Sequence, residues 1–571
     1  MRTSSLLYLA LALVASSSLV SADVVEYTFE VGNVTVTRLC NERVIAAVNG
    51  NLPGPTINVR EGDTLVVHAV NKSPYNLTLH WHGIFQLMSQ WADGPDYVTQ
   101  CPILPGGKYT YRFNVTAQEG TLWWHAHTSF LRAWVYGALI IRPRLGHTYP
   151  FPTPYQEVPI VFGEWWDRNV IGVEEEAQEF GGAPRLSDAY TINGLPGPLY
   201  NCSQNQTFQL NVLRGKTYLL RIVNAALNEH LFFKIANHNF TVVAVDAAYT
   251  NPYHTDIIVV APGQTVDALL TANQKVGSYF MAATPYQTLN GTNNNSTTTG
   301  IVVYSRSGSK TSPLMPSLPV NNDTQTANTF YSGLTGLVGG PHWVPVPKNV
   351  DEHMFITIGL GLDFCNLPNN TCWGPNNSTR LSASMNNESF VLPVGRRFSM
   401  LDAFYRNATN GVYTKDFPDQ PPFVFNYTDT SINANQGPAF APKSTKVKTL
   451  KFNSTVQIVF QNTAIIAPEN HPMHIHGLNF HILAQGTGDY NATRDESKFN
   501  LKDPQIRNTV SVPFAGWAVI RFQANNPGVW LVHCHIDTHL TWGLSMAFEV
   551  ANGPTPDTTL PPPPADLPTQ C

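Results

Sequence analysis

The stretch from His533 to His539 combines residue types that bind transition metals. It reads His-Cys-His-Ile-Asp-Thr-His, so a thiol lies between two imidazoles and a third imidazole follows five residues after the thiol. Side chains of an extended strand alternate between its two faces. His533 and His535 would therefore point to one side and Cys534 to the other, so one short strand would hold two metal sites back to back. Taken alone, the stretch also fits a strand with an ordinary buried cysteine.

Three further His-x-His pairs favour the metal interpretation. They are His80/His82, His125/His127 and His474/His476. Both imidazoles of a pair share one face of a strand, so the four pairs together supply eight converging imidazoles. Eight suits a cluster of three ions that take two, three and three nitrogens. Zinc is the main competitor for imidazole clusters, but it has no redox role and such a set of ions has no evident zinc use.

A second site follows from the residues that remain. His471, Cys534 and His539 provide two imidazoles and a thiolate. This is the trigonal ligand set of a blue-copper electron-transfer site. Cys534 would then connect an electron-transfer site to a three-ion cluster through its own strand.

The elements that must position these residues form an internal repeat with three copies. Each copy opens with a polar turn and an apolar strand that runs to Asn71, Asn224 or Asn462, and it closes on two glycine-led strands. Short β-branched runs dominate and no long helical period is present. We expect an all-β chain of three tandem β-sandwich domains, and a linker rich in Ser, Pro, Gly and Asn. The predicted ranges are 23–145, 155–305 and 351–571 for the domains and 306–350 for the linker.

The histidine pairs occur only in the first and third copies. We therefore expect the three-ion cluster at the interface of those two domains. The middle copy has no histidines at the equivalent strand positions, so it should be a spacer without metal.

The N-terminus has the features of a secretory signal. Arg2 precedes an apolar run, Leu6 to Val14, that is too short to span a bilayer, and Val20-Ser21-Ala22 is a small-residue cleavage site. We expect residues 1–22 to be removed and the protein to be secreted. No later apolar run is long enough to cross a membrane, so no membrane attachment is expected.

The composition indicates a glycosylated surface. Charged residues make up 13% of the chain, against roughly 25% in ordinary soluble proteins. N-linked glycans would make such a surface wettable, although some Asn-x-Ser/Thr triplets arise by chance. Such triplets begin at Asn33, Asn76, Asn114, Asn239, Asn290, Asn377, Asn407, Asn426, Asn453 and Asn491. The net charge of −5 and the lack of a basic stripe argue against nucleic-acid binding, and we expect a monomer.

Seven cysteines are an odd number for a secreted chain. If Cys534 is a metal ligand, the other six are free to pair completely in an oxidising compartment. The connectivity does not follow from the sequence. Our expectation is Cys101–Cys571, Cys40–Cys202 and Cys365–Cys372.

The metal motifs resemble the four copper signatures of the multicopper oxidases, and the chain is most similar to the plant laccases among them. The motifs are His80-Trp81-His82-Gly83, His125-Ala126-His127, the run from His471 to Gly477, and the Cys534 stretch. The likeness covers nearly the whole mature chain. It implies three cupredoxin-like domains of Greek-key β-sandwich or barrel form and four coppers per chain. The middle domain would form a wall of the substrate pocket.

The resemblance also implies a ligand set for each copper. The type 1 copper is expected on His471, Cys534 and His539, and the type 2 copper on His80 and His474. The two type 3 coppers are expected on His82, His125 and His535, and on His127, His476 and His533. Gly83 and Gly477 would let the backbone pass close to the cluster.

Leu544 lies ten residues after Cys534, at the axial position of the type 1 site. Some relatives have Met there. An isobutyl group cannot coordinate copper, and loss of the thioether donor favours Cu(I) and raises the potential. A non-coordinating Leu544 argues against ascorbate oxidase, which has Met at this position. The alternative outside enzymes is a copper-free structural cupredoxin-repeat wall protein, which the complete ligand set disfavours.

By resemblance we expect a secreted laccase of the cell wall or apoplast that acts in lignin polymerisation or phenol detoxification. It would oxidise phenols such as monolignols in one-electron steps and reduce O₂ to water. Electrons would enter by the edge of His539 and leave through Cys534.

Three carboxylates are expected to handle protons. Asp93, and Asp537 inside the cluster strand, would supply protons for O₂ reduction, and Asp256 would accept the phenolic proton, as an acid of related laccases does. Each has a plainer interpretation. Asp93 fits a turn residue beside Gly94, Asp537 a strand-end cap or surface acid, and Asp256 a solvated acid at the start of a strand.

Overall fold

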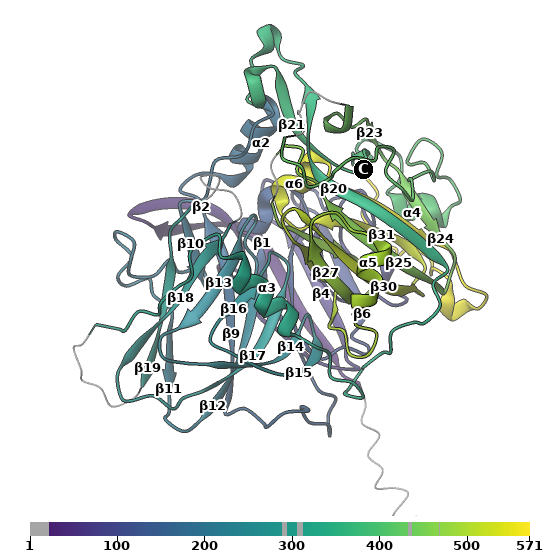
Figure 1. The fold of residues 1–571 in the computed structure, drawn as a ribbon. Coiled ribbons are helices and arrows are strands. Elements are labelled where there is room, and N and C mark those ends of the chain that lie inside the picture. Colours follow the sequence, from purple (N-terminus) through teal and green to yellow (C-terminus); the bar gives the residue numbers. More distant parts are fainter. Residues whose placement is uncertain (1–21, 288–293, 305–311, 432–436, 467–468) are drawn as a thin grey trace, which may run out of the picture.

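The computed structural model describes residues 22–287, 294–304, 312–431, 437–466 and 469–571 (Figure 1). Strands dominate this part of the chain, as predicted, and they form three pairs of sheets, each pair sharing one hydrophobic core. Nearly all of the predicted signal peptide and the Asn290 glycosylation site lie outside the described residues.

The first pair of sheets has the strand orders β2-β1-β4-β6 and β3-β8-β7-β5. Along β6, Tyr109, Tyr111 and Phe113 are buried and alternate with exposed or half-exposed residues, so one face of the strand covers the core. The strands are β1 (Val24–Arg38), β2 (Asn41–Val48), β3 (Ile57–Arg60), β4 (Thr64–Asn71), β5 (Leu79–His82), β6 (Lys108–Asn114), β7 (Gly120–Ala126) and β8 (Tyr136–Arg142).

The second pair has the orders β10-β9-β12-β17-β14-β15 and β11-β19-β18-β13-β16. The strands are β9 (Gln156–Trp165), β10 (Ala189–Ile192), β11 (Gln209–Val212), β12 (Thr217–Asn224), β13 (His230–Ile235), β14 (Phe240–Val245), β15 (Ala248–Thr255), β16 (Ile258–Val260), β17 (Thr265–Thr271), β18 (Ser278–Tyr286) and β19 (Thr298–Tyr304). Between β9 and β10 the chain forms helix α2 (Val170–Phe180), capped by the Asn169 side chain and ended by a left-handed Gly181. Val170 and Val173 of α2 pack into the core of the first domain.

The third pair has the orders β21-β20-β25-β30-β27-β28 and β24-β32-β31-β26-β29. The strands are β20 (Glu352–Phe364), β21 (Thr379–Met385), β24 (Val447–Leu450), β25 (Ser454–Asn462), β26 (His471–Ile475), β27 (Phe480–Thr487), β28 (Ile506–Arg507), β29 (Thr509–Val512), β30 (Gly516–Ala524), β31 (Gly528–Cys534) and β32 (Ser545–Val550). A separate small sheet joins β22 (Ser389–Phe390) to β23 (Lys443–Ser444). The short helices here are α4 (Met400–Tyr405), α5 (Ala492–Asp495) and α6 (Asp537–Trp542).

The repeat predicted from the sequence has a structural basis. β4, β12 and β25 end at Asn71, Asn224 and Asn462, and each asparagine Nδ2 donates to a main-chain oxygen of the following turn.

The segment predicted as a linker contains helix α3 (Thr324–Gly333), which begins after the capping residue Asp323 and packs on the second core. The domain boundaries themselves remain a prediction.

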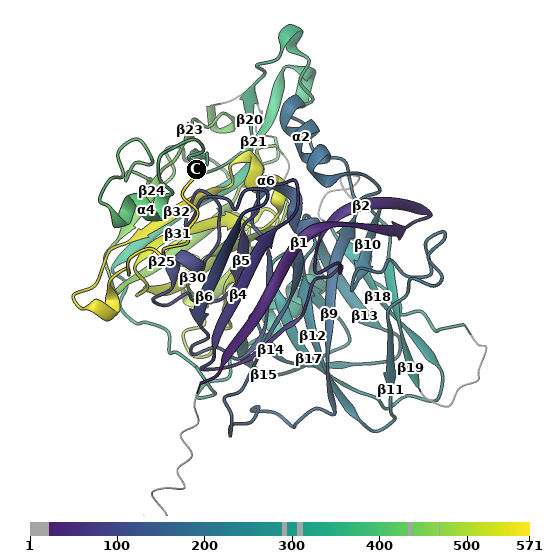
Figure 2. The same ribbon diagram turned by 180° about the vertical axis from the view of Figure 1, so that it is seen from behind.

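The third domain lies against the first (Figure 2), and covalent and polar contacts hold the two together. The three predicted disulfides are present, and Cys101–Cys571 ties the C-terminus to the first domain. Gln90 Nε2 donates to the Pro527 oxygen at 2.8 Å across the same boundary. Among the described cysteines, Cys534 alone is free, and it is buried. Within the described ranges no helix is both long and apolar enough to cross a bilayer.

Candidate metal centre

Four short strands bring the predicted ligands to the boundary between the first and third domains. β5 pairs with β7, which places His80 opposite His125. β26 pairs with β31, which places His474 opposite His533. Directly opposed residues of antiparallel strands have neighbouring side chains. Each of the two domains therefore presents two His-x-His pairs side by side.

The eight histidines are buried and their rings converge. His82 Nδ1 lies 3.1 Å from His535 Nε2, which joins the two domains, and His476 Nε2 lies 3.1 Å from His533 Nε2. Ring nitrogens that lie within 4.8 Å of one another belong to His80/His82/His125, to His80/His474/His476 and to His127/His476/His533. The structure thus brings the predicted cluster together, while the division of its ligands among individual ions remains a prediction.

Hydrogen bonds to the main chain set which ring nitrogen faces the cluster. The Nδ1 atoms of His80, His125 and His474 donate to carbonyl oxygens at 2.7–2.8 Å. A neutral imidazole that donates from Nδ1 leaves Nε2 as an acceptor. The Nε2 atoms of these three residues and of His127 are buried, and within the described residues they have no hydrogen-bond partner. Because metal ligands need such free lone pairs, this donor set fits copper.

Burial favours the neutral form of most of these imidazoles. It lowers the pKa of His82, His125 and His474 well below the ordinary value, and neighbouring imidazoles lower it further. The pKa of His533 falls to about 3, again mainly through burial. Neutral imidazole is the form that binds metal, so the folded protein holds these rings ready for ligation.

His82 uses the opposite ring nitrogen from its neighbours. Its Nε2 lies 2.9 Å from Asn508 Oδ1, which leaves Nδ1 facing His535. Gly263 of the middle domain packs against the same rings, since a Cβ at this position would lie 2.8 Å from His535 Cγ. With φ at +88°, Gly263 lets the backbone approach the ligands, a role that the sequence suggested for Gly83 and Gly477.

Cys534 forms a separate buried site on the other face of β31. Its Sγ lies 3.5 Å from His539 Nδ1 and 3.7 Å from His471 Nδ1. Burial raises the pKa of the Cys534 thiol. A bound cation therefore has to stabilise the thiolate, and the two neutral imidazoles complete a His₂Cys set that fits copper.

Leu544 is fully buried in the same core cluster as Cys534. Its amide donates to the His539 oxygen at 2.9 Å, and its carbonyl accepts from the Cys534 amide at 3.0 Å. The backbone thus fixes Leu544 beside two residues of the His₂Cys set. Its side chain has no donor atom, and its axial, non-coordinating role remains a prediction.

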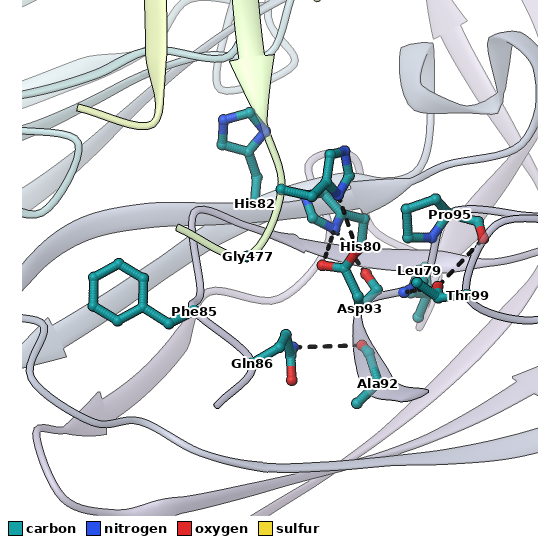
Figure 3. A network of polar contacts seen from close by, with 12 residues as sticks. Leu79, His80, His82, Phe85, Gln86, Ala92, Asp93, Pro95, Thr99 and Gly477 are labelled. Atoms are coloured by element: carbon teal, nitrogen blue, oxygen red, sulfur yellow. Dashed lines mark hydrogen bonds and ion pairs between the residues drawn. The ribbon is translucent and has the colours of Figure 1, made fainter. Parts of the chain in front are cut away.

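Asp93 is fully buried next to two cluster histidines (Figure 3). It follows the short 3₁₀ helix η1 (Gln90–Ala92), and His476 Nδ1 donates to its Oδ2 at 3.0 Å. Its main-chain oxygen accepts from His80 Nδ1 at 2.7 Å. The turn is sterically fixed, because Gly94 has φ at +101° and a Cβ there would overlap the Leu79 carbonyl. Asp93 therefore orients ligands as well as forming a turn.

Asp537 begins helix α6, so the prediction that it lies within the cluster strand is wrong. The strand ends at Cys534, because the chain has to turn back to bring His539 to the sulfur. Burial raises the pKa of Asp537 to about 6, although Arg132 opposes this shift. Arg132 was missed from the sequence. Its Nε lies 3.4 Å from Asp537 Oδ2, and its Nη1 lies 2.9 Å from His535 Nδ1.

The carboxylate beside the His₂Cys set is Glu469, which sequence reasoning also missed. Glu469 Oε2 lies 3.5 Å from His539 Nε2, and the side chain is 27% exposed. Asp256 is 61% exposed and forms an ion pair with Lys234 at 2.7 Å. In the sequence, the only indication that Glu469 belongs to this site is its position two residues before His471.

Known proteins are similar to this chain in sequence and in fold. Multicopper oxidase family profiles match residues 30–146, 156–307 and 416–554. The chain is 60% identical to Laccase-7 of Arabidopsis thaliana, with 98% of each chain covered. It is 56% identical to Laccase-24 of Oryza sativa subsp. japonica, with 100% of each covered. The crystal structure of a laccase from Botrytis aclada superposes with a TM-score of 0.71 at 27% identity, covering 95% of this chain and 89% of that one.

The chain therefore belongs to the multicopper oxidase family. Within that family its full-length relatives place it among the laccases. Its cofactor is copper, with four ions of types 1, 2 and 3 in each chain. The three pairs of sheets are the three cupredoxin-like domains of this fold.

Proposed function

We propose that this laccase oxidises monolignol-type phenols outside the cell and uses the electrons to reduce O₂ to water. The observation that carries the proposal is the complete pair of sites on β31. Cys534 faces His471 and His539 on one side of the strand, while the adjacent His533 faces His476 on the other. A site that accepts single electrons and a site with room for several ions thus share one strand.

Copper bound at these residues supplies one-electron oxidation at the His₂Cys set and four-electron reduction of O₂ at the eight-histidine cluster. The chain supplies the connection between them. Cys534 is bonded through its main chain to His533 and His535, so the two sites are joined covalently. His539 is 3% exposed and its Nε2 lies 3.5 Å from the partly exposed Glu469 carboxylate, which supports its role as the point of electron entry.

Carboxylates of the chain handle the protons of this reaction. Glu469 is placed to accept a hydrogen bond from a phenol hydroxyl at His539, and Asp256 is the second candidate for this role. Asp93 and Asp537 are proposed to supply protons at the cluster. The contacts of Asp93 to His476 and of Asp537 to Arg132, which itself contacts His535, support this assignment.

The location and state of the protein are also proposed. The signal-like N-terminus and the three disulfides support secretion to the cell wall or apoplast. The Asn-x-Ser/Thr triplets support N-glycosylation. We propose that the protein acts as a monomer without membrane attachment.

Copper content and a visible spectrum of the purified secreted protein test the proposal first. About four coppers per chain, an intense blue thiolate-to-copper band and O₂ uptake with monolignols are expected. Less than one copper and no blue band after reconstitution would instead indicate a structural cupredoxin-repeat protein. Faster turnover of ascorbate than of phenols would indicate ascorbate oxidase.

A further inference from the structure

A cavity of about 850 Å³ connects the buried cluster with the protein surface. Its inner wall includes the cluster histidines His125, His127 and His533, and His125 is only 2% exposed. Its outer wall includes Val394, which is 59% exposed. A cavity of this size with polar walls has room for water. Solvent therefore has a route to the eight-histidine cluster along this cavity.

Two carboxyl groups that the copper sites do not use line the same cavity. Asp96 is 8% exposed and lies beside the Thr128 hydroxyl. Glu174 of α2 is 5% exposed, and its Oε2 accepts from the Phe130 amide at 2.9 Å. Both contacts fall on residues 128–130, which directly follow the ligand His127. The two acids therefore lie along one wall that leads from the surface to a ligand.

Neither acid has a cationic partner among the described ion pairs. Carboxylates are seldom buried this far without a cationic partner. Asp96 and Glu174 repel each other, and Asp537 also raises the pKa of Glu174. Burial is the main cause that raises the pKa of each acid to about 7. Both groups thus gain and lose a proton near neutrality.

The other charged groups of this region are distributed along the cavity. The cavity wall contains Arg132 and Asp537 near the cluster, and Asp363, Arg380 and Lys443 toward the surface. Glu175 on α2 is exposed and also acts on Glu174. The ion-pair partner of Arg132 is Asp537, at 3.4 Å, so the charge of Arg132 is largely engaged there.

We propose that Asp96 and Glu174 carry protons from solvent along this cavity to the cluster. The inference rests on the proposed function. Four phenols release four electrons and four protons at the His₂Cys side and become four phenoxyl radicals. One O₂ takes up four electrons and four protons at the cluster and becomes two waters. The protons are released at the His₂Cys site but are needed at the eight-histidine cluster. The two acids line the route from solvent to that cluster.

The roles of the two acids differ from that of Asp93. Asp93 contacts ligands directly and orients them, whereas Asp96 and Glu174 hold no ligand nitrogen in the described hydrogen bonds. Their substitution is therefore expected to leave the copper sites intact. The alternative is a purely structural role, in which the two acids only anchor residues 128–130.

The test uses the copper-loaded proteins with Asp96→Asn, Glu174→Gln and both changes together. Glu175→Gln is the matched control, because it makes the same chemical change one residue away on the exposed side of α2. Each protein is first reduced by a phenol without O₂ and then mixed with O₂ in a stopped-flow instrument. The rate of reoxidation is recorded against pH in H₂O and in D₂O. Infrared titration follows the protonated carboxyl band.

We expect the double variant to retain four coppers and normal anaerobic reduction. Its reoxidation should proceed at about one tenth of the parent rate or slower, with a changed pH profile and solvent isotope effect. It should also lack a carboxyl band that titrates near pH 7 in the parent protein. Glu174→Asp should recover part of the rate. Unchanged reoxidation, pH profile and isotope effect in a fully loaded double variant would overturn the inference. In contrast, a parent protein that phenols cannot reduce would refute the proposed function itself.

Discussion

Asp93 of the first domain and His476 of the third are joined by a buried hydrogen bond of 3.0 Å. The main-chain oxygen of Asp93 also holds His80 at 2.7 Å. One residue therefore orients a cluster histidine from each domain. The cluster depends on the docking of the two domains and cannot be completed by either of them alone.

Replacing Asp93 by Ala should disturb both copper content and O₂ reduction. His476 would lose the acceptor that fixes its ring, and groups that orient metal ligands typically contribute 10- to 100-fold to metal affinity or activity. Copper per chain and steady-state O₂ uptake measure the effect. Asp557→Ala, at an exposed position, is the control and should change neither. Full copper content with unchanged O₂ uptake would show that Asp93 is only a turn residue.

Replacing Leu544 by Met should lower the reduction potential of the type 1 site. Leu544 is held between Cys534 and His539 by two main-chain hydrogen bonds, so a thioether there would lie beside the copper ligands. The swap conserves volume and should cost less than about 1.5 kcal/mol of stability. Redox titration of the blue band measures the potential, and weakly reducing phenols should turn over several-fold more slowly. Leu531→Met, buried in a different core cluster, is the control, and an equal potential in both variants would remove Leu544 from the axial position.

Glu469→Gln and Asp256→Asn separate the two candidates for the phenolic proton acceptor. Glu469 lies 3.5 Å from His539, whereas Asp256 is engaged by Lys234. We expect Glu469→Gln to lower kcat/KM for phenols by about 100-fold, the lower end of what a positioned base contributes, and Asp256→Asn to have little effect. Ferrocyanide gives an electron without a proton, so neither change should slow its oxidation much. A selective loss with Asp256→Asn would restore the assignment made from the sequence.

The sequence predicted the parts of the site that depend on strand geometry. Alternation along β31 was enough to place Cys534 and His533 on opposite faces. The acids depend on loops and helices, which carry no such period. Asp537 was misplaced because the turn into α6 has no strong helix signal, and Glu469 and Glu174 approach the sites only through tertiary packing.

Glu174→Gln should change the pH dependence of stability. The pKa of Glu174 rises from 4.5 to about 7 on folding, mainly through burial. The unfolded chain therefore loses this proton first as the pH rises, and the native protein loses stability between pH 4.5 and 7. That shift corresponds to roughly 3 kcal/mol, which the neutral glutamine avoids.

Thermal unfolding at pH 4 and pH 8 measures the effect. The variant should gain stability relative to the parent at pH 8 and not at pH 4, where the parent carboxyl is protonated. Glu175→Gln should show no such difference because Glu175 is exposed. A constant difference between parent and Glu174→Gln at both pH values would mean that folding does not shift the pKa of Glu174, and it would remove the physical basis for a proton carrier at this position.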